Sequence, residues 1–302
     1  MNWKKTLNVL AGWLLGATLL LAGVLKTLDP IAFADQVKSE GLVWILPAMA
    51  IAVLAIGIEV GLGAALILGL RQRWLLVVTS ALVAFFLFLT GRSYWKWTRG
   101  ELEDTACGCF GSLVERTPAE AFWQDLLLLL PTIAILWVFH RSVPRGRWPA
   151  LAAIVSGVAM VITLFSPSLP LDNLATGLRP GKQLSELCAG GDAPGDRACL
   201  DLVVPELAVG DHWVVLAELE DPLLLGAVSS LNDKYISGHS VWLFTPDEQD
   251  AIQQFTWTVG PSFPVREVPA SLLRRFYRTL PRSFHMIDGQ VVSTHRGVFV
   301  AQ

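Results

Sequence analysis

Charge is scarce in this chain of 302 residues, and the scarcity excludes several classes of protein. Only 16% of the residues are charged, 53% are hydrophobic, and the formal net charge is −3. A soluble domain carries about 25% charged residues, so an ordinary soluble enzyme is disfavoured. Basic residues never run longer than a pair, which leaves no electrostatic footprint for nucleic acid.

Cofactor fingerprints and internal repeats are also missing from the sequence. No Gly-x-Gly-x-x-Gly follows an expected strand, and no Cys-x-x-Cys-His is present. These absences argue against a bound nucleotide, flavin or covalently attached haem. Four cysteines and five histidines are scattered thinly, so we expect no metal site.

Long hydrophobic runs, in contrast, fill the first half of the chain. Residues 168–302 hold 10 of the 23 basic and 16 of the 26 acidic residues, so the preceding part is far more apolar than the average. A membrane span needs about 20 apolar residues. Five segments meet that length: 6–25, 43–70, 74–91, 121–139 and 148–167.

Basic residues predict the orientation of these spans. Three short segments carry lysine or arginine without acidic residues: Lys4 and Lys5, then Arg71 and Arg73, then Arg141, Arg145 and Arg147. By the positive-inside rule these segments are cytoplasmic, so the amino terminus lies inside and residues 168–302 lie outside a bacterial inner membrane. The alternative, a cleaved signal peptide ending near residue 34, is disfavoured because Lys26 and Asp29 intervene and further spans follow.

The second half alternates strand and helix patterns and ends in a hairpin with Asp288-Gly289 as its turn. This order resembles a thioredoxin-like domain over approximately residues 200–302, with Pro281 at the position of that fold's cis-proline. The family's Cys-x-x-Cys is missing, because Glu218-Leu219-Glu220-Asp221 follows the first central strand. Without a thiolate the domain cannot exchange disulfides by itself, which favours a binding or docking module.

All four cysteines fall on the predicted outer side, where disulfides persist. Cys188 and Cys199 flank a Gly-rich loop, which indicates a structural disulfide worth about 3 kcal/mol; the alternative is a redox-active pair that exchanges with the other two cysteines. Cys107 and Cys109 are separated only by Gly108, so a disulfide between them closes a small, readily reduced ring. Redox chemistry is therefore favoured there over structural or silent cysteines and over an incomplete zinc site.

Three motifs resemble the DoxX/MauE membrane family. They are residues 21–30 (LAGVLKTLDP) with Phe33 just after, Glu59-Val60-Gly61, and Cys107-Gly108-Cys109-Phe110-Gly111, the last being closest to MauE. The resemblance covers approximately residues 5–140 and implies a bundle of four membrane helices. It also implies a link to maturation of methylamine dehydrogenase, an enzyme rich in disulfides, with a separate thioredoxin-like partner. This chain resembles a fusion of both parts.

Three ionisable residues lie within or at the ends of the spans: Lys26, Glu59 and Asp125. Such residues are costly in a bilayer and normally face the bundle interior. They predict either a proton path or polar pocket that serves a quinone or thiol reaction, or a polar network that holds the bundle together. Tryptophans near the span ends are typical of an aromatic belt.

The sequence thus predicts four parts: a four-helix membrane domain (1–142), a fifth membrane helix (143–168), a linker with the cysteine loop (169–199) and an α/β thioredoxin-like periplasmic domain (200–302). The favoured function is thiol–disulfide redox or disulfide-dependent maturation, with Cys107 and Cys109 reacting, a quinone as carrier and an extracytoplasmic client or redox partner. A non-catalytic assembly factor and a DoxX-like subunit of a quinone-linked sulfur oxidoreductase are the alternatives.

Overall fold

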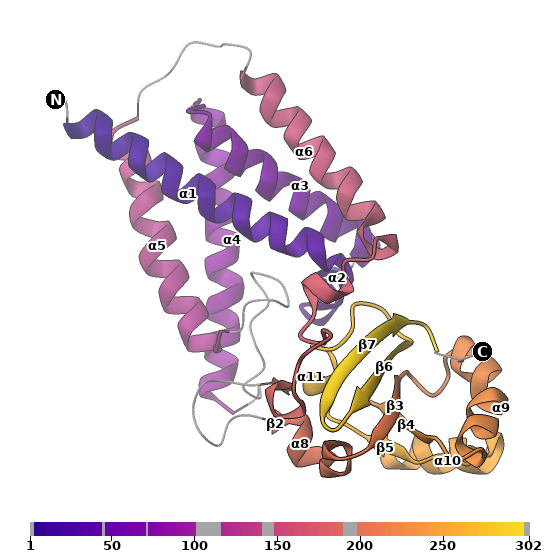
Figure 1. Cartoon of the computed structure of the whole chain (residues 1–302). Helices are drawn as coiled ribbons and strands as arrows, with labels where there is room; N and C mark the ends of the chain where they lie inside the picture. Colours follow the sequence, from indigo (N-terminus) through magenta and orange to yellow (C-terminus); the bar gives the residue numbers. More distant parts are fainter. Residues whose placement is uncertain are drawn as a thin grey trace. The chain divides into compact units, whose positions relative to one another are not determined.

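A computed structural model describes residues 3–43, 46–70, 72–100, 116–140, 148–189 and 198–298 (Figure 1). The chain divides into two compact units, Met1–Leu171 and Asp172–Gln302. We call the first the membrane unit and the second the C-terminal unit.

Five helices of the membrane unit are long and apolar enough to cross a bilayer, as the sequence predicted. A sixth, shorter helix, α2, was not predicted; it begins where Pro30 occupies its first turn and Asp29 caps it through Ala32 N at 3.1 Å. The helices are α1 (Trp3–Leu28), α2 (Pro30–Ser39), α3 (Ala48–Ile67), α4 (Arg73–Thr98), α5 (Pro118–Val138) and α6 (Trp148–Phe165), followed by the 3-10 turn η2 (Ser166–Ser168).

Small residues allow the first two spans to pack closely. A Cβ atom added at Gly16 of α1 would lie 2.8 Å from the carbonyl oxygen of Gly63 in α3. Such close approach stabilises helix pairs in lipid, where van der Waals packing replaces the hydrophobic effect. Helix α1 also packs against α5, α3 packs against α6, and α4 packs against α5 (Figure 1).

The C-terminal unit contains a five-stranded sheet with the order β5-β4-β3-β6-β7. Strands β3, β4 and β5 are parallel, whereas β6 and β7 run antiparallel to their neighbours. Helices α9 and α10 cover one face of the sheet, and residues 178–189 and 198–207 together with α11 cover the other. The strands are β3 (Asp211–Leu216), β4 (Ser240–Thr245), β5 (Val265–Glu267), β6 (Arg282–Ile287) and β7 (Gln290–Arg296).

This topology is thioredoxin-like, as the sequence predicted. Asp288 and Gly289 both adopt positive φ in the β6–β7 turn, and the Leu280–Pro281 peptide bond is cis. The main helices and short elements are α7 (Asp172–Ala175), η3 (Leu184–Glu186), β1 (Cys188–Ala189), β2 (Ala198–Cys199), α8 (Leu200–Val203), η4 (Pro205–Ala208), α9 (Pro222–Ile236), α10 (Gln249–Val259) and α11 (Ala270–Leu273).

Two segments differ from their sequence patterns. Leu178, Leu184 and Leu187 lie in the core of the C-terminal unit, so much of the expected linker is part of that unit. The helical pattern of the sequence predicts a single helix over residues 270–279, but the helix ends at Leu273. Beyond it, the carbonyl of Phe276 accepts a hydrogen bond from Arg282.

Candidate functional site

A buried ion pair lies inside the membrane unit. Lys26 of α1 donates a hydrogen bond from Nζ to Oε1 of Glu59 in α3, and their side chains are 1% and 0% exposed. The sequence suggested that Lys26 ends its helix near the outer surface. Helical side chains lean toward the amino end of their helix, so Lys26 can reach back into the bundle and neutralise Glu59.

Two aromatic rings line the ammonium group of Lys26. Its Nζ lies 4.7 Å from the ring centroid of Phe33 in α2 and 5.0 Å from that of Phe86 in α4. Aromatic faces attract a cation most strongly where water is excluded. Four helices therefore contribute to one charged centre, which we call the Lys26–Glu59 centre.

One carboxylate oxygen of this centre is unsatisfied. Oε2 of Glu59 is buried and has no hydrogen-bond partner among the residues that the structure describes. Buried polar atoms normally find a partner, and an exception requires an explanation. An ionisable residue buried within a membrane span is a functional-site hypothesis by default. The open oxygen is where a proton or a polar ligand atom would bind.

Hydroxyl groups of the fifth span, α6, contact the chain next to this centre. Thr163 Oγ1 of α6 lies 3.4 Å from Thr27 Oγ1, and Ser166 Oγ donates to the carbonyl of Leu28 at 3.3 Å. Both contacts are made by the two residues that follow Lys26 at the carboxyl end of α1. They hold α6 against this end of α1.

A second ion pair lies where α5 begins. Arg116 Nη1 is 3.1 Å from Oδ1 of Asp125, and the two side chains are 10% and 7% exposed. Lys26 also interacts electrostatically with Asp125. Arg92 of α4 pairs with Glu40, just after α2, at 3.0 Å. Charged residues therefore connect the carboxyl end of α1 with the first half of α5, and a separate ion pair connects α4 with the residue after α2.

Cys107 and Cys109, the predicted redox pair, lie outside the described residues. The described chain ends at Gly100, after α4, and resumes at Arg116, before α5. Both cysteines therefore belong to the connection between the two helices whose ends carry Arg92 and Arg116. Their role stays a prediction.

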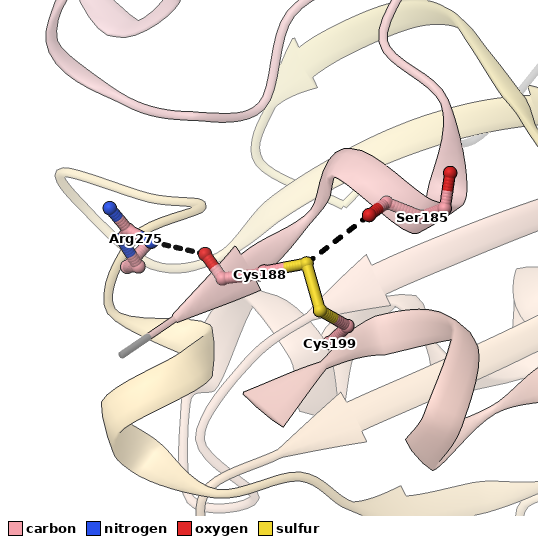
Figure 2. Close-up of a disulfide and its surroundings, with 4 residues drawn as sticks. All are labelled: Ser185, Cys188, Cys199 and Arg275. Atoms are coloured by element: carbon pink, nitrogen blue, oxygen red, sulfur yellow. Dashed lines mark hydrogen bonds between the residues drawn. A yellow bond between two sulfur atoms is a disulfide. The ribbon is translucent and has the colours of Figure 1, made fainter. Parts of the chain in front are cut away.

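The other two cysteines are joined by a disulfide in the C-terminal unit (Figure 2). Cys188 and Cys199 pair across the short strands β1 and β2, and Arg275 donates to the carbonyl of Cys188. The Sγ of Cys188 lies 3.2 Å from the carbonyl of Ser185; a disulfide sulfur carries no proton, so this is a contact and not a donated bond. The choice between a structural and a redox role stays a prediction.

The turn that carries Cys-x-x-Cys in thioredoxins is occupied here by an acidic segment. Leu219 N donates to Oδ2 of Asp247 at 2.8 Å, and Asp221 caps α9 by accepting from Leu223 N at 2.8 Å. These hydrogen bonds stabilise the turn, which contains no cysteine. The C-terminal unit therefore keeps the frame of a thioredoxin-like domain, including cis-Pro281, without its nucleophile.

A buried arginine, Arg282, lies at the start of β6, directly after cis-Pro281. Arg282 is 1% exposed and donates to the carbonyls of Phe276 at 2.6 Å and Leu178 at 3.2 Å. It also donates to Thr176 Oγ1 at 2.7 Å and to Asn173 Oδ1 at 3.2 Å. Burial lowers the pKa of Arg282 to about 10, although Asp172 opposes the change. No local sequence pattern distinguishes Arg282 from the other basic residues of the C-terminal unit.

A stack of four side chains lies on the α9 face of the sheet. Lys234 Nζ is 3.8 Å from the ring centroid of Trp213, whose ring stacks on His285 at 3.9 Å. Nε2 of His285 is 2.6 Å from Oδ1 of Asp211. Partial burial lowers the pKa of Lys234, and the charge of Asp211 raises it.

These features define a multi-pass membrane protein that carries a thioredoxin-like domain. Residues 4–138 match the family model of methylamine utilisation protein MauE, so the first four spans are MauE-like. The C-terminal part is similar to a crystal structure described as "a putative Thiol:disulfide interchange protein DsbE from Chlorobium tepidum", with 15% identity and a TM-score of 0.32 over 41% of this chain and 89% of that chain. No curated protein matches the chain.

Proposed function

We propose that this protein is a thiol–disulfide redox protein of a bacterial inner membrane, which oxidises client proteins on the extracytoplasmic side. Cys107 and Cys109 form the reacting disulfide in this account. It takes two electrons and two protons from a client dithiol, which becomes a disulfide. The resulting cysteine pair then passes both electrons and both protons to a quinone, which becomes the quinol.

The observation that carries this proposal is the Lys26–Glu59 centre. Two protons must pass from the thiols to the quinone, and a buried acid–base pair with an unsatisfied carboxylate oxygen is suited to relay them. Cys109 precedes Arg116 by seven residues, a stretch of chain that spans at most about 25 Å. Arg116 in turn binds Asp125, which interacts with Lys26. The thiols are therefore tethered by a short stretch of chain to Arg116, which joins the network of charges around Lys26.

The C-terminal unit serves as the client-binding part in this account. Its thioredoxin-like frame retains cis-Pro281 but has Glu218 to Asp221 in place of the reactive cysteines. A domain of this kind can hold a client near the membrane without reacting with it. By analogy with the matched family, the client is an extracytoplasmic protein that needs disulfides for its maturation.

The same domain favours a second candidate function, a non-catalytic assembly factor. In that case the bundle anchors the chain, and the Cys107–Cys109 pair contributes no electron transfer. The two candidates differ in one property, which is whether client oxidation depends on the two thiols.

The test uses the full-length protein in liposomes that contain a quinone, with a reduced dithiol peptide outside. Cys107→Ser with Cys109→Ser is expected to abolish quinone reduction. Cys188→Ser with Cys199→Ser is the matched control, which removes the same number of sulfurs and is expected to retain most of the rate. Equal rates in both double variants would reject the redox function, and a client complex that survives loss of all thiols would favour the assembly factor.

A further inference from the structure

A cavity opens at the end of the membrane unit opposite to the Lys26–Glu59 centre. It lies between the amino end of α1 and the carboxyl ends of α3 and α5, and its volume is about 700 Å³. None of the residues assigned to the redox function lines this cavity. The cavity is large enough to hold a headgroup or part of an acyl chain.

Basic side chains line one part of this cavity. Lys4 and Lys5 contribute two ammonium groups, and His140 contributes an imidazole ring. Both ring nitrogens of His140 are buried without a hydrogen-bond partner among the described residues. Asn8, in contrast, is occupied because its side-chain amide donates to the carbonyl of Phe139 at 3.0 Å. A ligand oxygen would satisfy the imidazole.

Apolar side chains form the remaining wall. Trp13, Ile67 and Val138 line the cavity and are 57%, 36% and 74% exposed, so they face the surroundings of the bundle. On a membrane span those surroundings are lipid. A cavity with ammonium groups at one side and lipid-facing apolar side chains at the other fits an amphipathic molecule.

The charge balance selects an anion. The described residues that line the cavity include two lysines and no aspartate or glutamate. The carboxyl ends of α3 and α5 add partial negative charge, whereas the amino end of α1 adds partial positive charge. The two full charges on Lys4 and Lys5 outweigh these partial charges. Basic pockets between membrane helices on the cytoplasmic side are typical sites for anionic lipid headgroups.

We propose that this cavity binds one anionic phospholipid of the cytoplasmic leaflet. The phosphate is bound by Lys4, Lys5 and the imidazole of His140. An acyl chain lies along Trp13 and Val138. Residues Lys4 and Lys5 thus act as a specific lipid site in addition to their part in orienting the first span.

The experiment measures lipid retention by the full-length protein with native mass spectrometry. Phosphatidylglycerol and phosphatidylcholine are supplied in equal amounts, and phosphatidylglycerol is expected to be retained preferentially. Lys4→Gln with Lys5→Gln should weaken its binding by roughly fivefold for each lysine. Lys38→Gln with Lys96→Gln removes the same charge away from the cavity and should leave binding unchanged.

A second variant separates the cavity from general surface charge. Val9 lines the cavity, so Val9→Trp fills it while Lys4, Lys5 and His140 stay in place. We expect this variant to lose phosphatidylglycerol as well. Retention of the lipid by Val9→Trp would show diffuse adsorption to basic residues and overturn the site.

A third measurement distinguishes a phospholipid headgroup from free inorganic phosphate as the ligand. Inorganic phosphate in excess is expected neither to displace the lipid nor to protect residues 4–9 from hydrogen exchange. Displacement or protection by phosphate alone would define a simple anion site and contradict the proposal. Equal retention of the two phospholipids would also contradict it.

Discussion

Lys26 of the membrane unit and Arg282 of the C-terminal unit are both 1% exposed, yet their surroundings differ. Arg282 donates four hydrogen bonds, all of them to neutral oxygen atoms of nearby residues. Lys26 instead binds a single carboxylate, and the second oxygen of that carboxylate has no partner among the described residues. One buried charge donates to four neutral acceptors, whereas the other belongs to an incomplete ion pair.

The difference indicates two roles. A cation that donates several hydrogen bonds to backbone and side-chain oxygens fixes the chain segments around it. An incomplete ion pair costs stability, and such a cost is expected to persist where a function needs it. We therefore interpret Arg282 as an organising residue and the Lys26–Glu59 centre as a reacting one.

The largest expected effect concerns the membrane centre. Lys26→Met leaves the Glu59 carboxylate buried without its partner and should lower the free energy of unfolding by about 3–5 kcal/mol. Lys26→Met with Glu59→Leu should recover most of this loss, because no unpaired charge remains. Thermal unfolding of the full chain in detergent measures both variants.

The double variant also distinguishes structure from function. If the centre relays protons from the thiols to the quinone, the stable double variant stays inactive in quinone reduction. Full activity in that variant would show that the pair only holds the bundle together. Lys26 would then have the same structural role as Arg282, which contradicts the two roles given above. Lys38→Met, at an exposed lysine on α2, is the matched control for loss of a single ammonium group.

Substitution of Arg282 should lower the stability of the C-terminal unit without another effect. Arg282→Met leaves the carbonyls of Phe276 and Leu178 without a donor and should destabilise the C-terminal unit by about 3 kcal/mol. Hydrogen exchange of β6 and β7 in the full chain measures the loss. Arg266→Met, at an exposed arginine, is expected to change stability by less than about 0.5 kcal/mol. Equal effects of the two substitutions would contradict the role given to Arg282.

A loss of similar size is expected when the disulfide is removed. Cys188→Ser with Cys199→Ser opens a covalent loop between residues 11 apart and should reduce stability by about 3 kcal/mol. Client oxidation should continue near the original rate at a temperature where the variant is folded. Loss of oxidation in the folded variant would instead favour the redox-active alternative for this pair.

The smallest effect is a dependence on pH in the C-terminal unit. The pKa of Lys234 is lowered from the ordinary value of 10.5, so between the two values the folded unit binds fewer protons than the unfolded chain. Stability should therefore rise as the pH rises through the folded pKa toward 10.5. Lys234→Met should flatten this rise, and denaturant unfolding across alkaline pH would detect it. If stability rose with pH as steeply in Lys234→Met as in the original protein, the assignment of this rise to Lys234 would be wrong.

Hydrophobic length and strand alternation predicted much of the fold from the sequence. All five spans and the thioredoxin-like topology followed from these local patterns. Helix α2 was missed because it is short and only partly apolar, although Asp29-Pro30 was a readable start signal. The early end of α11 was not predicted, because the local pattern of residues 270–279 does not show that the carbonyl of Phe276 accepts a hydrogen bond from Arg282.

The candidate site was predictable only in part. The cost of intramembrane charge identified Lys26, Glu59 and Asp125 as residues to examine. Their partners were not predictable, since Lys26 and Glu59 are 33 positions apart and Asp125 pairs with Arg116 from a connecting segment. Phe86 lies in an ordinary apolar helix, and no local pattern distinguishes it as a neighbour of Lys26.

The most direct measurement follows the oxidation state of Cys107 and Cys109 in liposomes by differential alkylation and mass spectrometry. The account predicts that a client dithiol reduces this pair, that an added quinone oxidises it again, and that the variant Lys26→Met with Glu59→Leu blocks the second step. Thiols that keep one state whether or not client and quinone are present would contradict it.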